Sequence, residues 1–142
     1  MADPVLLAEA TRGPFVESRH LGHAVIARAD GTIVESWGNP DELVFARSAA
    51  KLLQALPLVE SGAGVDLSTE QLALACASHS AERRHIERVR RWLGELGLDE
   101  HALCCGPQPS RDERLAEDMI RKGEPVTSAF NWCSGKHSGY LT

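Results

Sequence analysis

The stretch Arg47-Ser48-Ala49-Ala50-Lys51, followed by Leu52-Leu53-Gln54-Ala55-Leu56, is the part of the sequence that says most about the fold. The second part is apolar enough to bury a helix, and helix positions i and i+3 share a face. Ser48 and Lys51 are therefore expected to lie side by side at the start of a buried helix. A buried lysine amine loses its proton more readily than one in water. The pair thus has the chemistry of a serine nucleophile with a lysine base, and the positive helix end favours an oxyanion there.

The motif alone leaves a second interpretation open, in which Lys51 is a solvated residue on an ordinary amphipathic helix. The lysine content of the chain favours the functional interpretation. There are three lysines, Lys51, Lys122 and Lys136, against twelve arginines. Two of these lysines lie in segments rich in serine or cysteine, where an amine that can lose its proton is useful and a guanidinium is not.

The composition is that of an ordinary soluble domain. The chain has 142 residues, 43% of them hydrophobic and 25% charged, with a net charge of −5. This predicts one domain with a core and gives no indication of a nucleic-acid or membrane surface. Met1-Ala2-Asp3-Pro4 lacks the features of a signal peptide, and no window approaches the roughly 18 apolar residues of a membrane span. Four cysteines without a disulfide-framework spacing predict reduced thiols and a cytoplasmic location.

One β-hairpin is predicted near the N-terminus. His23–Arg28 and Thr32–Trp37 are rich in β-branched residues, and Ala29-Asp30-Gly31 between them is a hairpin turn signal. A single hairpin beside helices would leave a small, exposed sheet.

Four helices are predicted after the hairpin. The first covers residues 48–60, and Pro57 would kink or shorten it. The second is opened by the capping box Ser68–Gln71, and the third covers residues 81–95. The fourth is opened by a capping box at Ser110–Glu113 and closed by Gly123. In the third helix, Ile86, Val89, Leu93 and Leu96 form an apolar stripe. The arginines on its other side alternate with glutamates, which indicates a solvated face rather than a phosphate-binding one.

Ser80, in the segment CASHS at residues 76–80, has two interpretations. It is either the N-cap of the helix that follows or a second hydroxyl near Ser48. His79 is either a base or a surface histidine in a polar turn.

Residues 131–142 are dense in reactive side chains and then end abruptly, so we expect the sequence to be part of a longer protein. Cys133 and Lys136 are at positions i and i+3, and a thiolate beside an amine is a nucleophile, a metal ligand or neither. Cys133 and His137 would supply two of the four ligands that zinc normally takes, leaving two unaccounted for.

Four segments together resemble the Rhizobium etli-type (asparaginase II) family of L-asparaginases. They are FARSAAK at 45–51, QALPLVESGA at 54–63, CASHS at 76–80 and NWCSGKH at 131–137. The resemblance runs from about Val5 to Thr142, with the segments in the family's order. It implies an α/β fold of the α+β type, a sheet flanked by helices as in serine β-lactamases and glutaminases. Residues 1–142 would be the N-terminal part of one such domain, in a protein that is usually a homodimer.

The resemblance implies hydrolysis of L-asparagine to L-aspartate and ammonia. Ser48 matches the family's nucleophile and Lys51 the base of its Ser-Lys tandem. Ser80 matches the serine of a second tandem, whose lysine would lie beyond Thr142. A chain without that lysine is not expected to be a competent enzyme alone.

The remaining matches concern metal and substrate. Cys133 and Lys136 match two of three protein ligands of a zinc ion that tunes substrate handling, and the third ligand would again lie beyond this sequence. Arg47 and His137 match residues lining the substrate site. Two alternatives stay open: another amidase or β-lactam hydrolase on the same scaffold, and a shortened, non-catalytic zinc-binding or regulatory paralogue.

Overall fold

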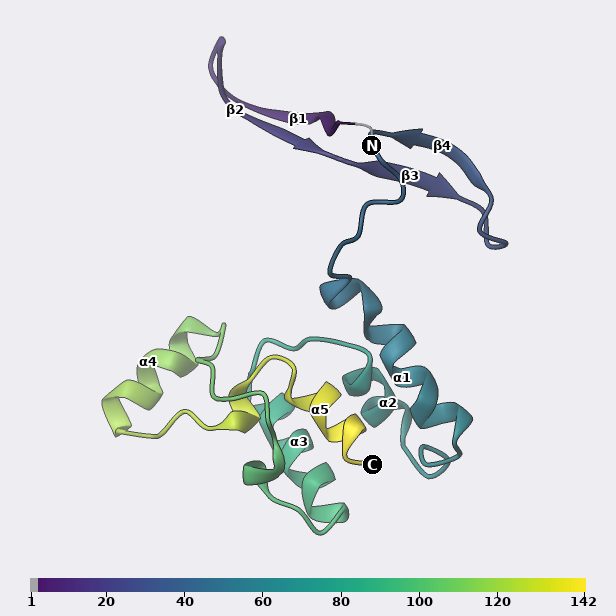
Figure 1. The fold of residues 1–142 in the computed structure, drawn as a ribbon. Helices are drawn as coiled ribbons and strands as arrows, with labels where there is room; N and C mark the ends of the chain where they lie inside the picture. The colour runs from purple at the N-terminus through teal and green to yellow at the C-terminus, as the bar shows by residue number, and fades with distance from the viewer. Residues whose placement is uncertain (1–2) are drawn as a thin grey trace. The chain divides into compact units, whose positions relative to one another are not determined.

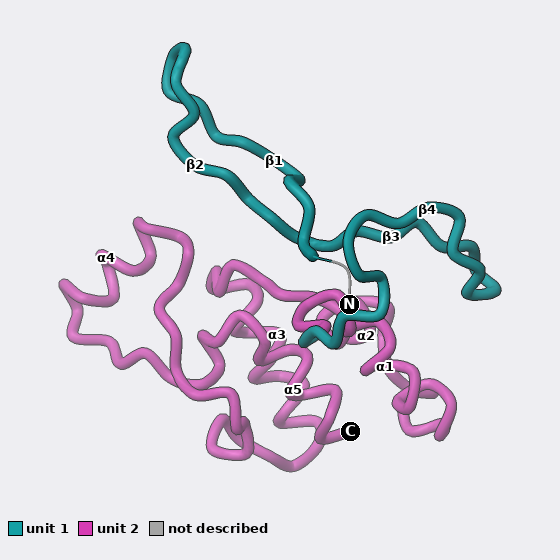
Figure 2. Tube along the Cα trace, turned by 45° about the horizontal axis from the view of Figure 1, so that its top comes forward, with its two compact units in different colours: residues 1–45 teal, residues 46–142 magenta. Residues whose placement is uncertain are grey.

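The computed structural model describes residues 3–142, and the chain divides into two compact units, Met1–Phe45 and Ala46–Thr142 (Figure 2). The described part of the first unit contains strands, and the second unit contains helices (Figure 1). This is a mixed α+β composition, as the resemblance implied.

The first unit holds two antiparallel hairpins, each forming a two-stranded sheet of its own. In chain order the strands are β1 Val5–Arg12, β2 Phe15–Gly22, β3 Ala24–Ala27 and β4 Ile33–Trp37. The β3–β4 hairpin confirms the sequence prediction. Two features stabilise its turn. Gly31 takes a positive φ of 85°, and the Asp30 carboxylate accepts a 2.9 Å hydrogen bond from the Thr32 N–H.

The β1–β2 hairpin was not predicted from the sequence. Its two-residue turn, Gly13-Pro14, is a turn signal that was available. Side chains along both hairpins are mostly exposed, for example Phe15 at 74% and Val34 at 57%. Because a two-stranded sheet has no second layer, it buries little of its apolar surface, as expected for a small sheet.

The second unit is a set of short helices. In chain order they are η1 Arg47–Ala50, α1 Lys51–Glu60, α2 Thr69–Ala75, α3 Arg83–Glu95, η2 Glu100–Ala102, α4 Glu113–Lys122, η3 Ser128–Phe130 and α5 Ser134–Tyr140. The predicted helix over 48–60 is present as the 3₁₀ turn η1 running into α1. Pro57 lies inside α1, which continues to Glu60, so the expected shortening does not occur.

Of the three caps expected for α2 and α4, two are present. Ser68 and Gln71 form the predicted capping box at the start of α2, and Gly123, with φ 63°, ends α4. The capping box expected at Ser110 is wrong. Asp112 caps α4 by accepting from the N–H groups two and three residues on, and the Ser110 hydroxyl instead accepts from the Asp112 N–H. Asp is as good a cap as Ser, and the position nearer the helix prevails.

The predicted stripe of helix α3 contributes three residues to the core. Ile86, Val89 and Leu93 are at most 2% exposed, whereas Leu96 lies past the helix end and is only partly buried. One cluster joins the stripe to α4 and η3, with Met119 and Phe130 as its largest other members. A second cluster places Trp92 of α3 against α1 and α2; its other buried members are Leu58, Leu74 and Ala75.

Helices α2 and α5 approach each other closely because α5 presents glycine at the contact. A Cβ on Gly135 would lie 2.9 Å from Leu74 Cβ, and one on Gly139 would lie 3.0 Å from Ala75 Cβ. The glycines in SGKHSG therefore serve helix packing, which fixes the position of α5 and the reactive residues at its start.

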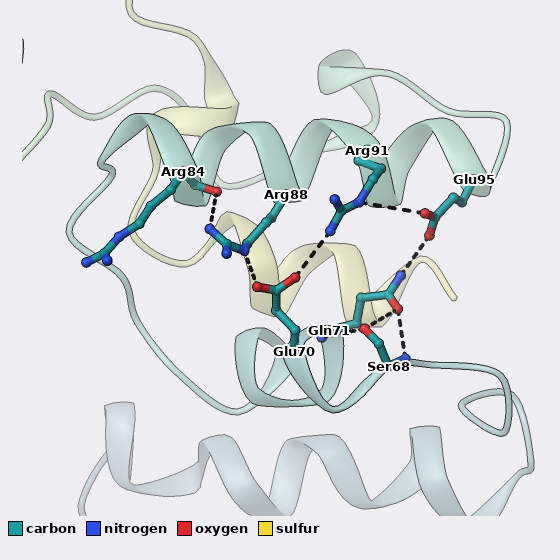
Figure 3. A network of polar contacts seen from close by, with 7 residues as sticks. All are labelled: Ser68, Glu70, Gln71, Arg84, Arg88, Arg91 and Glu95. Carbon is teal, nitrogen blue, oxygen red and sulfur yellow. Dashed lines mark hydrogen bonds and ion pairs between the residues drawn. The ribbon is translucent and has the colours of Figure 1, made fainter.

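The arginines of α3 form a solvated, ion-paired face, as predicted. Figure 3 shows Arg88 and Arg91 both paired with Glu70 of α2, and Arg91 also lies 3.9 Å from Glu95. Exposed pairs of this kind each contribute about 0–1 kcal/mol, so they support the α2–α3 contact without dominating it. No helix within residues 3–142 is both long enough and apolar enough to cross a membrane.

Candidate active site

Ser48 and Lys51 lie one 3₁₀ turn apart at the junction of η1 and α1. The Lys51 backbone N–H donates to the Ser48 carbonyl oxygen, which closes that turn. Side chains at i and i+3 eclipse one another in a 3₁₀ turn, so the two residues share a face as predicted. Ser48 is exposed, whereas Lys51 is only 7% exposed. An exposed serine thus lies one turn before a buried lysine.

The side-chain hydrogen bond of Lys51 goes to Ser78, a residue that the sequence interpretation did not single out. Lys51 Nζ donates to Ser78 Oγ, and Ser78 Oγ lies 3.8 Å from Cys133 Sγ. The structure therefore brings the start of α1, the segment before α3 and the start of α5 to one place. A signal for Ser78 was present in the sequence, since it is the other hydroxyl of the Ser-His-Ser segment.

His79 holds that segment in place and is neither a surface residue nor a free base. It is 8% exposed, its Nε2 lies 2.9 Å from Ser134 Oγ, and its Nδ1 accepts from the Ala81 N–H at 3.1 Å. Because the Ser134 hydroxyl donates to the Ala129 carbonyl, it accepts from His79, which places the proton on Nε2. Burial, with a smaller contribution from His85, lowers the pKa of His79 to about 4. The surface interpretation of His79 is therefore wrong.

Ser80 is not the N-cap of α3, so that interpretation is also wrong. The N-cap is Glu82, and the Ser80 hydroxyl donates a 2.7 Å hydrogen bond to the Glu82 carboxylate. This bond, as the largest cause, lowers the pKa of Glu82. Ser78 and Ser80 both line a surface depression, which Glu82, Arg84 and His85 also border. The two hydroxyls are thus presented to solvent on one concave surface.

The backbone is in an unfavourable conformation beside both candidate serines. Among the described residues, the non-glycine residues with positive φ are Arg47 at 49° and Ala81 at 58°. Arg47 precedes Ser48, and Ala81 follows Ser80. A left-handed conformation costs a non-glycine residue about 1–2 kcal/mol, and such residues cluster at functional sites.

Cys133, Lys136 and His137 lie at and after the start of α5. Cys133 is the N-cap residue, and its N–H donates to Asn131 Oδ1 at 2.9 Å. Lys136 Nζ lies 5.6 Å from the centre of the Tyr140 ring, and the His137 ring lies 5.5 Å from that same ring. Burial and, to a lesser degree, the Lys136 charge lower the pKa of His137.

The described residues do not by themselves form a zinc site. No three His, Cys, Asp or Glu side chains within residues 3–142 come together in a way that could hold a metal ion. Cys133 and Lys136 offer one thiolate and one amine, whereas zinc normally takes four ligands.

A model of the L-asparaginase II family matches residues 8–142, nearly the whole chain. The chain therefore belongs to the L-asparaginase II family, a family of amidohydrolases that act on asparagine. A search among curated proteins found no match.

Proposed function

We propose that this protein hydrolyses the side-chain amide of L-asparagine to L-aspartate and ammonia in the manner of the Rhizobium etli-type enzymes. Ser48 is the nucleophile and Lys51 its base. The observation that carries the proposal is the exposed Ser48 hydroxyl one turn from the buried Lys51 amine, in a chain of the L-asparaginase II family.

The reaction proceeds through an acyl-enzyme. Lys51 takes the proton from Ser48 Oγ as that oxygen attacks the side-chain carbonyl carbon, and backbone N–H groups at the start of the η1–α1 helix stabilise the oxyanion. Lys51 then gives its proton to the amide nitrogen, the C–N bond breaks and ammonia leaves. Water, deprotonated by the same amine, attacks the β-aspartyl ester and releases aspartate and the Ser48 hydroxyl.

The other candidate residues bind the substrate and complete the site. Arg47 offers a guanidinium next to the nucleophile for the substrate α-carboxylate, and His137 lines the same site. Ser80 serves as the hydroxyl of a second Ser-Lys tandem.

Cys133 and Lys136 hold a modulatory zinc ion together with donors from outside residues 3–142, in a cytoplasmic homodimer. Metal content after exhaustive dialysis, with Cys133→Ser as the comparison, tests the zinc assignment; equal zinc in both samples would contradict it.

Ammonia release from L-asparagine by the full-length protein tests the catalytic assignment. Ser48→Ala is expected to lower kcat by about 10³-fold or more while the far-UV circular dichroism is unchanged, because the nucleophile is lost and the fold is not. Ser36→Ala, an exposed serine on β4, is the matched control and should retain full activity. Normal turnover by Ser48→Ala would overturn the assignment. Turnover of glutamine or a β-lactam in place of asparagine would identify a related hydrolase on the same scaffold.

A further inference from the structure

Ala81, the residue after Ser80, is held in a left-handed conformation by hydrogen bonds on both sides. Its φ is 58°, and it is fully buried in the core cluster that contains the α3 stripe. Its N–H donates to His79 Nδ1 at 3.1 Å, and its carbonyl oxygen accepts a 2.9 Å hydrogen bond from the Ser110 hydroxyl. These two groups belong to the two peptide planes that meet at the Ala81 Cα. Because both planes are held, the φ and ψ of Ala81 are held as well.

Ser110 is itself fixed where the chain enters α4. It is 9% exposed, and its Oγ accepts from the Asp112 N–H at 3.0 Å while its hydroxyl donates to the Ala81 carbonyl oxygen. The next residue, Arg111, donates its backbone N–H to the Ser80 carbonyl oxygen at 2.9 Å. Ser110 and Arg111 therefore hold two successive carbonyl groups, those of Ser80 and Ala81.

Trp132 is tied to the chain on both sides of this contact. The Arg111 guanidinium carbon lies 3.6 Å from the centre of the Trp132 ring, a cation–π contact, and the Trp132 indole N–H donates to the Pro109 carbonyl oxygen at 3.0 Å. The Trp132 carbonyl oxygen accepts from the His79 N–H at 3.0 Å. The segment with Ser110 and the segment with Ser80 thus share one anchor, next to Cys133.

The conformation of Ala81 decides where the Ser80 hydroxyl lies. Ala81 separates Ser80 from Glu82, and the left-handed turn brings their side chains into a 2.7 Å hydrogen bond at the edge of the depression. An alanine keeps a positive φ only where its surroundings hold it there. Without the Ser110 hydroxyl, the Ala81 carbonyl would be buried without this partner, so we expect the turn to relax.

We propose that Ser110 is a positioning residue for Ser80: its hydroxyl holds the Ala81 turn, and this turn presents the Ser80 hydroxyl in the depression. The proposal deepens the proposed function and rests on it, because the part of Ser80 in the reaction is assigned there. Ser110 touches no reacting atom and acts through the backbone of residues 80–82.

Amide hydrogen exchange tests the held turn without using activity. In the full-length protein, NMR follows exchange of the Ala81 N–H, with the Val89 N–H inside α3 as the measure of global opening. Ser110→Ala should speed exchange at Ala81 by about tenfold, the effect of one lost buried hydrogen bond, and leave Val89 unchanged. Ser36→Ala, an exposed serine on β4, is the matched control and should change neither amide.

Kinetics of asparagine hydrolysis provide the second readout. Ser110→Ala should lower kcat by about tenfold and change KM by less than about twofold, because the groups that bind the substrate remain. Glycine adopts a positive φ without steric conflict, so adding Ala81→Gly to Ser110→Ala should restore most of kcat. A general loss of packing would not be repaired in this way, since Ala81→Gly removes a buried methyl group.

Unchanged exchange at Ala81 in Ser110→Ala overturns the proposal, and so does equal acceleration at Ala81 and Val89. A wild-type kcat in Ser110→Ala overturns it as well, as does a lowered kcat that Ala81→Gly does not restore. Faster exchange confined to Ala81, in a protein whose wild type does not hydrolyse asparagine, would support the held turn and contradict the proposed function instead.

Discussion

At the scale of the residue, the site contains polar groups that are held by defined hydrogen bonds. His79 is the clearest case, because both ring nitrogens are bonded and the ring is buried. The bond that Nδ1 accepts comes from the N–H of Ala81, a residue with positive φ next to Ser80. Protonation of Nδ1 would remove this bond. The state of His79 and the shape of the backbone beside Ser80 are therefore linked.

A pH dependence of stability follows from His79. Its pKa of about 4 lies below the value of 6.5 expected in the unfolded chain, so the unfolded state takes up the proton first as the pH falls. The stability is complete above about pH 6.5 and declines between pH 6.5 and 4, by up to about 3 kcal/mol. Urea unfolding at pH 7 and pH 5 measures this loss. The lowered pKa values of His85 and His137 add to it with the same sign.

His79→Gln separates this contribution from the others. The variant should show a smaller loss of unfolding free energy between pH 7 and pH 5 than the wild type, by about 2 kcal/mol. His101→Gln is the control, because that side chain is 96% exposed and should leave the loss unchanged. An identical pH dependence in His79→Gln and wild type would refute the interpretation.

At the scale of the element, local patterns predicted α1 to α4 but no helix at α5, and they predicted the polar contacts between helices poorly. The α3 stripe, the Ser68 capping box and Gly123 are local signals, and each was read correctly from the sequence. The partner of Lys51 was missed because it lies 27 positions along the chain, where no periodicity links the two. The role of Gly135 was invisible for the same reason, since only the contact with α2 requires a glycine there.

The α2–α5 contact predicts opposite effects for two similar substitutions. Gly→Ala inside a helix is normally stabilising by about 1 kcal/mol, and Gly94→Ala in α3 should behave so because nothing lies within 4 Å of the new Cβ. In Gly135→Ala the Cβ would lie 2.9 Å from Leu74 Cβ and 3.1 Å from the Leu74 carbonyl oxygen. Overpacking of this kind costs about 1–3 kcal/mol, so a lower Tm is expected. Thermal unfolding measures both, and a raised Tm for Gly135→Ala would mean that α5 can move away freely.

At the scale of the whole molecule, all the candidate residues belong to one of the two compact units, Ala46–Thr142. The segment before this unit carries large exposed apolar side chains, with Leu43 at 96% and Phe45 at 93%. Residues 42–46 have no regular secondary structure. The chain is therefore accessible to a protease next to the unit that holds the site.

Limited digestion with chymotrypsin should cut first after Leu43 or Phe45. The buried aromatic residues Trp92 and Phe130, each 1% exposed, should resist cleavage, because a protease needs an exposed and extended substrate. Mass spectrometry of the early fragments identifies the cut, and a Leu43→Ser, Phe45→Ser double variant should slow it. Early cleavage at Trp92 would show that the helical unit opens before the segment is cut.

The positive φ values of Arg47 and Ala81 lead to different expected results for selection on stability and selection on activity. A library randomised at these positions and screened for heat resistance alone would enrich glycine at both, because glycine adopts this conformation without steric conflict. If Arg47 binds the substrate as proposed, a screen for asparagine hydrolysis would retain arginine at position 47, since glycine has no guanidinium. The two screens should therefore diverge at Arg47 and converge at Ala81, which would tell a binding residue from a merely tolerated one.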